Sequence, residues 1–475
     1  SYASTGLGAA TTYSYRVRAY NSTGDSGYSN SASATTSAAS GNRFSRRHGD
    51  TVDDRGQAVA VDGAGNVVVT GHLDGVTDLG AGLISSFVHP AMGPTVDVVI
   101  AEYSSSGAHL WSRVIGSDGA EEGKGIATDS TGNVLVTGYQ GSYAVDYGGG
   151  PQYNRGGYDV FMAKYSSAGS WVWSRTVGGG GYDQGTGIAA DDAGNVVVTG
   201  HLGASSMGAD FGGGALVSAG NNDVFVVKYS ATGVHVWSKR LGSTGNDAGM
   251  AIGADSSGNV FVAGTFEGTV DFGAGPVSSA GLRDVFLVKF TPAGQLAWAK
   301  RFGGTGDDVA NGLAVDSMSN VVVSGKFQSS VGFGGALLTS AGGDDVFVAK
   351  LDGPTGNHLW SKRFGSTGGD ISTGVAVDGN DNVVVGGYYA GAVDFGGGAL
   401  QALGIDVFAV KYSSAGAHVW SRRFGGANTQ ICDGVAAAGN GDVIVTGFFF
   451  DTIDFGTGAM TTVGGYDGFL AGVGP

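Results

Sequence analysis

The chain is poor in cysteine, proline and charge. Among its 475 residues are one cysteine, Cys432, seven prolines and only 14% charged side chains. A single cysteine excludes an intrachain disulfide framework and any metal site built from several thiolates, so we expect Cys432 to act as a small buried hydrophobic residue. Apolar runs also stay well short of the ~18 residues that a membrane-spanning helix needs.

Positive charge is scarcer than negative charge. The sequence has 25 Lys and Arg against 41 Asp and Glu, a formal net charge of −16. Because no basic stripe is present to displace the counterions of phosphate groups, the composition argues against nucleic acid or an anionic membrane as the partner.

Glycine, in contrast, is abundant. There are 92 glycines, far above the usual ~7%, together with 42% hydrophobic residues. Disordered glycine-rich linkers lack that apolar content, so the glycines indicate many short strands separated by tight turns.

Residues 1–36 differ from the rest of the chain. Apolar and polar residues alternate through Tyr13, Tyr15 and Val17 and then reach a turn at 22–25, a hairpin pattern. The stretch resembles the last two strands of a fibronectin type III domain, about a third of such a domain, with Tyr13 at the tyrosine corner. The residues that match are Leu7, Tyr13, Tyr15, Arg16, Val17, Ala19 and Asn21. We expect a partial domain at 1–36 that belongs to a longer, processed protein and offers an assembly surface, followed by a linker at 37–42.

From residue 43 the chain is periodic. Trp111, Trp173, Trp237, Trp298, Trp360 and Trp420, with Phe44 before them, follow one another at intervals of 60 to 67 residues. Each unit has four apolar runs; the third unit has GIAAD (187–191), NVVVTGHL (195–202), DVFVVKY (223–229) and HVWSKRL (235–241). Four short strands in each of seven units, without helical periodicity, predict an all-β, seven-bladed β-propeller with four antiparallel strands per blade.

The runs also predict where each strand lies in a blade. NVVVTG and DVFVVKY are apolar on both sides, so both faces of the sheet must be covered by neighbouring blades. The first run has small residues such as Ala127, Ala189 and Gly253, which suit the crowded strands near the axis. The Trp run would be outermost, where an indole fills the wider gap between blades.

The two ends of the periodic region complement each other. The last unit lacks a Trp run, whereas the first residues, FSRRHG at 44–49, supply an extra one. We therefore predict that the outer strand 43–48, with Phe44, Arg46 and Arg47, completes the last blade, closes the ring and removes its open edges.

The repeat also carries a family resemblance. GIAADDAGNVVVTG (187–200), VDFGGG (393–398) and DVFVVKY (223–229) resemble the SBBP seven-bladed β-propeller repeat of bacteria, and the resemblance extends over residues 43–475. It implies a large secreted or cell-surface propeller, often joined to fibronectin-like modules. It implies no uniform enzymatic activity, so no catalytic residues are carried over.

Acidic residues recur at three positions of the unit. One set precedes the first run, and the others begin at Asp78 and Asp97; we expect all three on one face. Either they form a negative ring that binds Ca²⁺, cationic groups or sugar hydroxyls, or each carboxylate accepts backbone N–H bonds in a tight turn. The first set contains Asp54, Glu121, Asp183, Asp247, Asp308 and Asp370, with Gln430 in the seventh unit. The partial calcium motif DGNDN at 378–382 has Val383 where glycine is needed, so we expect an ordinary turn, no metal site and no cofactor.

Two connections break the symmetry of the repeat. They span 84–97 and 142–159 and carry aromatic residues where other units have Gly, Ala and Ser. Exposed together, these residues would form an adhesive patch; alternatively they only cover the face of the propeller. The candidates are Phe87, His89, Tyr143, Tyr147, Tyr153, Arg155 and Tyr158.

Catalytic motifs are weak. Glu121 and Glu122 form the one acidic pair that does not repeat, a candidate for glycoside hydrolysis. The unit YSSAGSWVW (165–173) is similar to the tryptophan-docking motif of quinoprotein-type propellers, which implies docking of Trp between blades. With one cysteine, quinone chemistry does not follow.

The sequence thus favours a non-catalytic binding or scaffold module, secreted or at the cell surface, with protein subunits or a surface glycan as partners. The alternatives are a polysaccharide-acting enzyme and an envelope-assembly scaffold resembling quinoprotein-like propellers.

Overall fold

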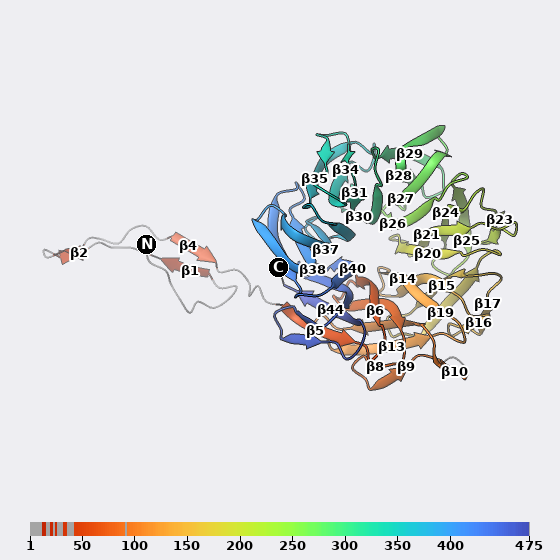
Figure 1. Ribbon diagram of the computed structural model, residues 1–475, viewed down its shortest axis with the longest axis horizontal. Coiled ribbons are helices and arrows are strands. Elements are labelled where there is room, and N and C mark those ends of the chain that lie inside the picture. The colour runs from red at the N-terminus through yellow and green to blue at the C-terminus, as the bar shows by residue number, and fades with distance from the viewer. Residues whose placement is uncertain are drawn as a thin grey trace.

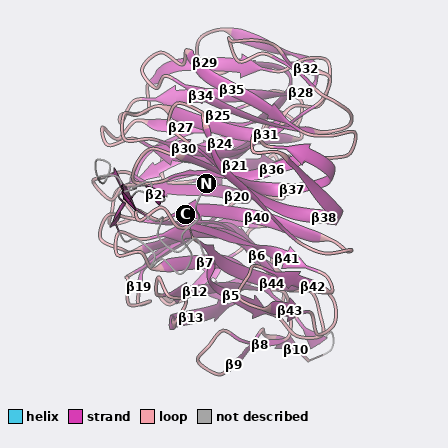
Figure 2. Cartoon of the chain, turned by 90° about the vertical axis from the view of Figure 1, so that its left-hand side faces the viewer, coloured by secondary structure: helices cyan, strands magenta, loops and turns pink. Residues whose placement is uncertain are grey.

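The protein is described from a computed structural model that places residues 12–15, 20–21, 24–25, 32–35, 42–90 and 93–474. All regular elements in these ranges are strands (Figure 2). Seven four-stranded antiparallel sheets stand around a central axis (Figure 1). The predicted seven-bladed β-propeller is therefore confirmed. Within the described ranges, no helix is long and apolar enough to span a membrane.

Each blade is described from the innermost to the outermost strand. Blade 1 comprises β6 (Arg55–Val61), β7 (Val67–Leu73), β12 (Asp97–Tyr103) and β13 (His109–Ile115). Blade 2 comprises β14 (Glu121–Thr128), β15 (Val134–Gln140), β18 (Asp159–Tyr165) and β19 (Trp171–Val177). Blade 3 comprises β20 (Gln184–Ala190), β21 (Val196–Gly203), β24 (Asn222–Tyr229) and β25 (His235–Leu241). Blade 4 comprises β26 (Ala248–Ala254), β27 (Val260–Asp271), β28 (Pro276–Phe290) and β29 (Leu296–Phe302).

The remaining blades follow the same order. Blade 5 comprises β30 (Val309–Val315), β31 (Val321–Phe327), β34 (Asp345–Leu351) and β35 (His358–Phe364). Blade 6 comprises β36 (Ile371–Val377), β37 (Val383–Asp394), β38 (Ala399–Tyr412) and β39 (His418–Phe424). Blade 7 comprises β40 (Gln430–Ala437), β41 (Val443–Phe449), β44 (Asp467–Val473) and β5 (Asn42–His48).

Short hairpins extend the connections between the second and third strands of most blades. They pair β8 (Val76–Asp78) with β9 (Leu83–Ser85), β10 (Val88–His89) with β11 (Gly93–Pro94), β16 (Ala144–Asp146) with β17 (Pro151–Tyr153), β22 (Ala209–Asp210) with β23 (Ala215–Leu216), β32 (Ser330–Val331) with β33 (Leu338–Thr339), and β42 (Thr452–Asp454) with β43 (Ala459–Thr461). In blades 4 and 6 this hairpin is continuous with the two long strands of the blade.

The N-terminal region contains two antiparallel pairs. Strand β1 (Thr12–Tyr15) pairs with β4 (Ala32–Thr35), and β2 (Tyr20–Asn21) pairs with β3 (Gly24–Asp25). The fibronectin type III assignment and the domain boundaries stay predictions, since Leu7, residues 16–19 and residues 37–41 lie outside the described ranges. Asn42, placed in the linker by the sequence, begins strand β5.

The middle strands of each blade form the core. All seven residues of β18 are buried, as are those of β34. Both faces are covered because each blade packs on two neighbours: Val197 and Val224 of blade 3, for example, join Val260 and Phe286 of blade 4 in one apolar cluster. Cys432 is fully buried in β40, as predicted.

Blade 7 is closed by the N-terminal strand. In Figure 1, β5 lies beside β44, and Phe44 is paired with Gly472. Phe44 packs on Gly107 of blade 1, where a Cβ would lie 2.6 Å from its ring, just as Trp111 packs on Gly169 of blade 2. The predicted ring closure is confirmed, with Phe44 in the structural position of tryptophan.

The arginines of this strand also follow the pattern of the other blades. Arg46 Nε donates to the Gly107 carbonyl at 2.6 Å, and Arg113 Nε donates to the Gly169 carbonyl at 2.7 Å. Arg47 pairs with Asp467 at 2.5 Å, equivalent to the contact between Arg240 and Asp223. The N-terminal strand thus makes the same contacts as a covalently continuous outer strand.

Tryptophan docking between blades is present as well. Trp173 Nε1 donates to the Ala231 carbonyl at 3.2 Å and Trp237 Nε1 to the Pro292 carbonyl at 3.0 Å, in each case in a turn of the next blade. Trp420 is the exception, because blade 7 takes its two outer strands from opposite ends of the chain and has no such turn. Its buried Nε1 has no acceptor among the described residues.

Candidate functional site

Every innermost strand contains a β-bulge at the same place. In blade 3, Gly185 pairs with Gly200 and Gly187 with Thr199, so Thr186 is an extra residue without a partner. A bulge re-aims the side chain of the extra residue. The seven bulge residues are Gln57, Lys124, Thr186, Met250, Asn311, Thr373 and Asp433.

A glycine in the second strand makes room for each bulge. A Cβ on Gly200 would lie 1.9 Å from the carbonyl oxygen of Gln184, and a Cβ on Gly71 equally close to that of Arg55. Such an approach of two backbones is possible only at glycine. This accounts for the glycine at the end of motifs such as VVVTG, which positions the bulge beside it.

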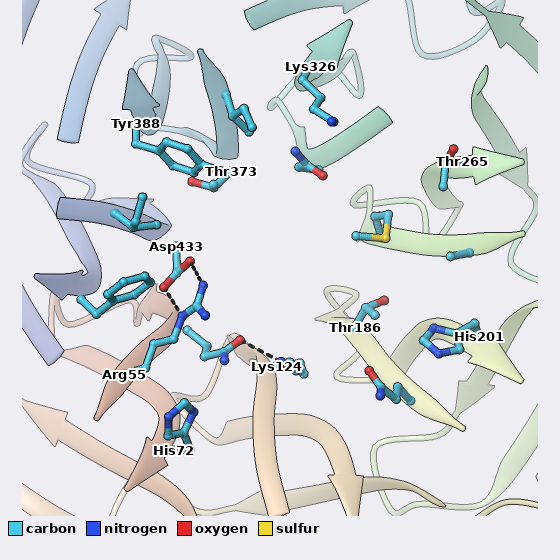
Figure 3. Close-up of a pocket in the computed structure, with 18 of the residues that line it drawn as sticks. Arg55, His72, Lys124, Thr186, His201, Thr265, Lys326, Thr373, Tyr388 and Asp433 are labelled. Atoms are coloured by element: carbon cyan, nitrogen blue, oxygen red, sulfur yellow. Dashed lines mark hydrogen bonds and ion pairs between the residues drawn. The ribbon is translucent and has the colours of Figure 1, made fainter. Parts of the chain in front are cut away.

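The seven bulge side chains line one cavity at the axis, with a volume of about 1210 Å³ (Figure 3). Its walls also include the first residues of several innermost strands and the residue that follows the glycine in several second strands, such as His72, His201 and Tyr388. The cavity is therefore built by equivalent positions of different blades.

Where blades 7 and 1 meet, Arg55 and Asp433 form a bidentate ion pair. Arg55 Nε and Nη2 donate to the two carboxylate oxygens of Asp433, each at 2.6 Å. Burial raises the pKa of Asp433, although the charge of Arg55 opposes the shift. The guanidinium also lies over the ring of Phe448, 4.5 Å from its centre.

A second polar group joins blades 1 and 2. Glu122 accepts a hydrogen bond from Gln57, lies 3.0 Å from His72 Nδ1 and pairs with Lys124 Nζ at 2.7 Å. Burial by itself would raise the pKa of Glu122, but the hydrogen bond from His72 and the charge of Lys124 outweigh it and lower that pKa to about 2. Glu122 therefore stays ionised and bound to Gln57, His72 and Lys124.

Blades 4 and 5 contribute a third charged group. Arg283 binds Asp307 through two contacts of 2.7 and 2.6 Å, and Lys326 Nζ lies 2.9 Å from Asp344. With the two groups above, the four Lys and Arg side chains that line the cavity all have carboxylate partners.

The wall formed by blade 3 differs in its chemistry. Gln184 and His201 are cross-strand neighbours, and no described residue forms a hydrogen bond with their side chains or with that of Asn222. Burial lowers the pKa of His201, which keeps its ring neutral. The side chains of Gln184, His201 and Asn222 thus have unused capacity to donate and accept hydrogen bonds.

The opposite wall is largely apolar. Ile371, Tyr388, Ile431 and Phe448 line it, and Phe448 meets the ring of Tyr466 edge-on with centres 5.0 Å apart. In Figure 3, Tyr388 and Asp433 lie across the cavity from His201 and Thr186. A molecule in the cavity would thus have an apolar surface on one side and neutral hydrogen-bonding groups on the other.

Two of the three sets of repeated acids lie inside the protein, whereas the set that begins at Asp78 is exposed and accepts N–H bonds from glycines of its own turn, such as that of Gly80 at 2.7 Å. Asp183 accepts from the N–H groups of Gly179 and Gly203 at 2.7 and 2.8 Å, and this turn-stabilising geometry is the alternative that the structure favours over an open negative ring. The members Asp54, Asp183, Asp247, Asp308 and Asp370 are at most 2% exposed. The described residues contain no group of three His, Cys, Asp or Glu placed to hold a metal ion.

Glu121 belongs to this buried series, which corrects its selection as a surface or catalytic candidate. It is fully buried and accepts from the backbone N–H of Ser142 at 2.7 Å and of Ser117 at 3.0 Å. It fills in blade 2 the structural position that aspartate fills elsewhere, so the pair of Glu121 and Glu122 does not face a substrate together.

The aromatic insertions are only partly brought together. Tyr143 and Tyr153 are 72% and 54% exposed on the hairpin of β16 and β17, with ring centres 5.5 Å apart. Arg155 is exposed nearby, and Tyr158 is half-buried and stacked on Tyr139. Phe87, also exposed, and the half-buried His89 lie in the separate insertion of blade 1.

Tyr147 corrects the expectation of an exposed residue. It is 1% exposed and stacks on Phe161 with ring centres 5.0 Å apart. Phe211 and Phe272 occupy the same position in blades 3 and 4 and are buried too. Tyr147 is therefore the core aromatic of the VDFGGG element.

Sequence reasoning missed the cavity, although a signal for it exists. The residues on either side of each bulge are always small (Gly, Ala, Ser or Cys), whereas the bulge residue changes in size and charge. The triplets are GQA in blade 1 and GKG, GTG, GMA, ANG, STG and CDG in the others. His72 and His201 lie in separate blades, yet both line the cavity. Variation at an otherwise repeated position was the informative feature.

Comparison with known families gives one match within the repeat. The SBBP β-propeller repeat matches residues 236–265. These residues run from the outermost strand of blade 3 into the second strand of blade 4, so this match straddles two blades. The resemblance inferred from the sequence is supported here for the propeller; a bacterial origin and the fibronectin fragment stay expectations.

Curated relatives are distant and longer. A WD repeat-containing protein of Acanthamoeba polyphaga mimivirus, described as uncharacterized, is 26% identical over 401 residues, which cover 69% of this chain and 29% of that protein. The regulatory protein FlaEY of Caulobacter vibrioides is 27% identical over 173 residues, 35% of this chain and 18% of that protein. The chain thus spans less than a third of the length of either relative.

Solved structures are similar only in outline. The Pan2 WD40 domain of Neurospora crassa aligns over 88% of this chain and 89% of its own with 9% identity and a TM-score of 0.40. A quinohemoprotein alcohol dehydrogenase from Comamonas testosteroni aligns over 91% and 76% with 11% identity and a TM-score of 0.38. Neither carries an argument about function, and the fold assignment rests on the strand pairing of this chain.

Proposed function

We propose that this chain is a non-catalytic binding module that takes its ligand or partner into the central cavity. The observation that carries the proposal is the variation of the bulge residues: seven equivalent positions hold six residue types, and all seven line one cavity. A bulge needed only for the fold would repeat like its neighbours. Concave sites with a few convergent polar groups are typical of ligand binding.

The candidate acids argue against glycoside hydrolysis by the predicted pair. That reaction needs two carboxyl groups facing the substrate, one of them with a raised pKa so that it can act as an acid. Burial raises the pKa of Glu121, but this side chain is fully buried at the start of β14 and faces no substrate, and the pKa of Glu122 is lowered to about 2. A polysaccharide-acting enzyme built on these residues is therefore the weaker alternative.

We also propose that the propeller acts as an interaction scaffold within a larger protein outside the cell or at its surface. Supporting features are the SBBP resemblance, the net charge of −16, and similarity to a protein named for its WD repeats that is much longer than this chain. Protein subunits, a surface glycan and assembly through the N-terminal region are the proposed partners, and envelope assembly remains the fold-level alternative.

A photo-crosslinking experiment tests the cavity as the binding site. We would place p-benzoylphenylalanine at Asn246, at the cavity mouth, and separately at Leu359, which is 48% exposed on the outer strand of blade 5. Each protein would be irradiated in an extract of the source organism. We expect adducts from position 246 and none from position 359; adducts only from position 359, or none from either, would overturn the proposal.

A further inference from the structure

The cavity has a chemistry that suits a particular class of ligand. Resting on the proposed function, we infer that it binds a neutral glycan, with the C–H face of one sugar ring on the apolar wall of blades 6 and 7 and the hydroxyls of another ring on the polar wall of blade 3. Three independent features of the cavity support this assignment.

The first feature is the unpaired hydrogen-bonding wall. Gln184, His201 and Asn222 line the cavity, and no other described residue forms a hydrogen bond with their side chains. Two amides and an imidazole together offer both donors and acceptors. Sugar hydroxyls, which donate and accept, match this mixture, whereas a group that only accepts or only donates would leave part of it unpaired.

The second feature is the neutralisation of charge within the cavity wall. Arg55, Lys124, Arg283 and Lys326 are bound to carboxylates. At the mouth, Asp53 accepts from the backbone N–H of Tyr466 at 2.9 Å, and Glu267 from that of Asn246 at 3.1 Å. An anionic ligand would have to displace one of the carboxylates from its Lys or Arg and would be repelled by the carboxylates of Asp53 and Glu267, so a neutral ligand is favoured over an anionic one.

The third feature is the aromatic and aliphatic wall opposite. Tyr388 presents a ring there, between Ile371 and Ile431, whereas the Phe448 ring is already covered by the Arg55 guanidinium. A pyranose ring has hydroxyls around its edge and C–H groups on its faces, so a ring that stacks on Tyr388 directs its hydroxyls along this wall, and a neighbouring ring of the glycan reaches the polar groups opposite. The volume of about 1210 Å³ exceeds that of common small-molecule sites, which leaves room for more than one sugar ring.

Calorimetry with defined oligosaccharides tests the inference. Maltohexaose, cellohexaose, xylohexaose and N-acetylchitohexaose would be titrated into the full chain, and we expect at least one to bind. Gln184→Ala and His201→Ala should each weaken that binding about five- to tenfold, because each removes a hydrogen bond. Tyr388→Ala should weaken it about tenfold through loss of ring contact, and Thr186→Trp should abolish it by filling the cavity.

Controls separate binding from folding. Val236→Ala, on the exposed outer strand of blade 3, should leave the affinity unchanged. Each cavity variant should have the same melting temperature as the unaltered protein. If none of the four oligosaccharides binds, or if binding is insensitive to Tyr388→Ala and Thr186→Trp, the sugar inference is overturned.

The two proposals fail in different ways. Protein or peptide adducts at position 246, without oligosaccharide binding, would overturn the sugar ligand and leave the cavity as a binding site. Absence of adducts at position 246, with no oligosaccharide bound, would overturn both.

Discussion

The repeated and the non-repeated positions of the innermost strands lie side by side and serve different purposes. In blade 3, Asp183 and Gly185 repeat in most units and are buried, where they fix a turn and the start of a bulge. Gln184 and Thr186, their immediate neighbours, do not repeat and face the cavity. In this chain the repeated residues therefore specify the ring, and the residues that depart from the repeat specify what the ring can hold.

The same contrast holds for charged residues. Lys228 and Asp191 form a buried pair at 2.9 Å, repeated as Lys164 with Asp129 and Lys411 with Asp378. The pair of Arg55 and Asp433 occurs once and is more accessible. We therefore expect changes at repeated positions to affect stability and changes at non-repeated positions to affect binding.

The largest effect should come from removing the closing strand. Deletion of residues 42–48 removes the pairing partner of β44 and exposes Gly472 and its neighbours on an open edge. We expect loss of cooperative thermal unfolding, measured by calorimetry, and aggregation of the product. Deletion of residues 1–36 is the control and should leave the melting transition of the propeller in place; a deletion of 42–48 that still melts cooperatively would contradict ring closure by this strand.

Breaking a repeated ion pair should have the next largest effect. Asp191→Ala leaves the Lys228 ammonium buried and unpaired, which typically costs about 3–5 kcal/mol of unfolding free energy. Gln184 in the same blade faces the cavity, so Gln184→Ala should change the unfolding free energy by less than about 0.5 kcal/mol. Chemical denaturation of both variants checks the comparison, and equal losses would contradict it.

Substitution of the glycine opposite the bulge should have a smaller effect on stability. Gly200→Ala puts a Cβ 1.9 Å from the Gln184 carbonyl oxygen, so the two strands must separate. Overpacking of this kind costs about 1–3 kcal/mol of unfolding free energy. We also expect the shift of the strands to move Thr186 and to weaken the binding of any ligand in the cavity. Urea denaturation measures the cost. Gly63→Ala, where a Cβ meets nothing within 4 Å, is the control and should be nearly neutral.

The smallest expected effect is a dependence of stability on pH. Burial raises the pKa of Asp54 to about 7 and that of Asp247 and Asp308 to about 6. Since these folded-state values exceed those of the unfolded chain, the folded state binds more protons, and stability falls as pH rises from about 4 to 7. The melting temperature should be a few degrees higher at pH 5 than at pH 8; a rise with pH over that range would contradict the assignment.

Groups whose pKa is lowered in the folded state affect stability at acidic pH. Glu122, whose pKa is about 2, contributes stability above the pKa of its unfolded form and loses it as pH falls toward 2. Paired aspartates such as Asp191 and Asp378 behave alike, because their lysine partners lower the pKa against the effect of burial. Stability should therefore pass through a maximum near pH 4 to 5.

Much of the fold could be predicted because the residues needed to pack a blade between two neighbours recur in seven units of the sequence. Apolar runs on both sides of the middle strands, small residues near the axis and the displaced run at Phe44 each follow from packing blades in a closed ring. Tyr147 could also have been placed in the core, since Phe211 and Phe272 occupy its position.

The cavity could not be derived in the same way. A bulge shifts the register by one residue at a place where apolar alternation is already interrupted by glycine, so the pattern around Thr186 does not reveal which side chain is re-aimed. The burial of acids such as Asp183 could not be predicted either. It depends on the connections that contain Gly179 and Gly203, which fold over the carboxylate and donate N–H bonds to it.

On this proposal the bulge residues form the binding surface. The most direct measurement is a photo-crosslinking scan that compares the seven bulge positions with exposed positions of the outer strands. The outer positions are Leu110, Val172, Val236, Leu359 and Val419. We predict adducts with ligand or partner from bulge positions such as Thr186 and Met250 and none from the outer strands. Adducts confined to the outer strands, with all bulge positions unreactive, would contradict the account.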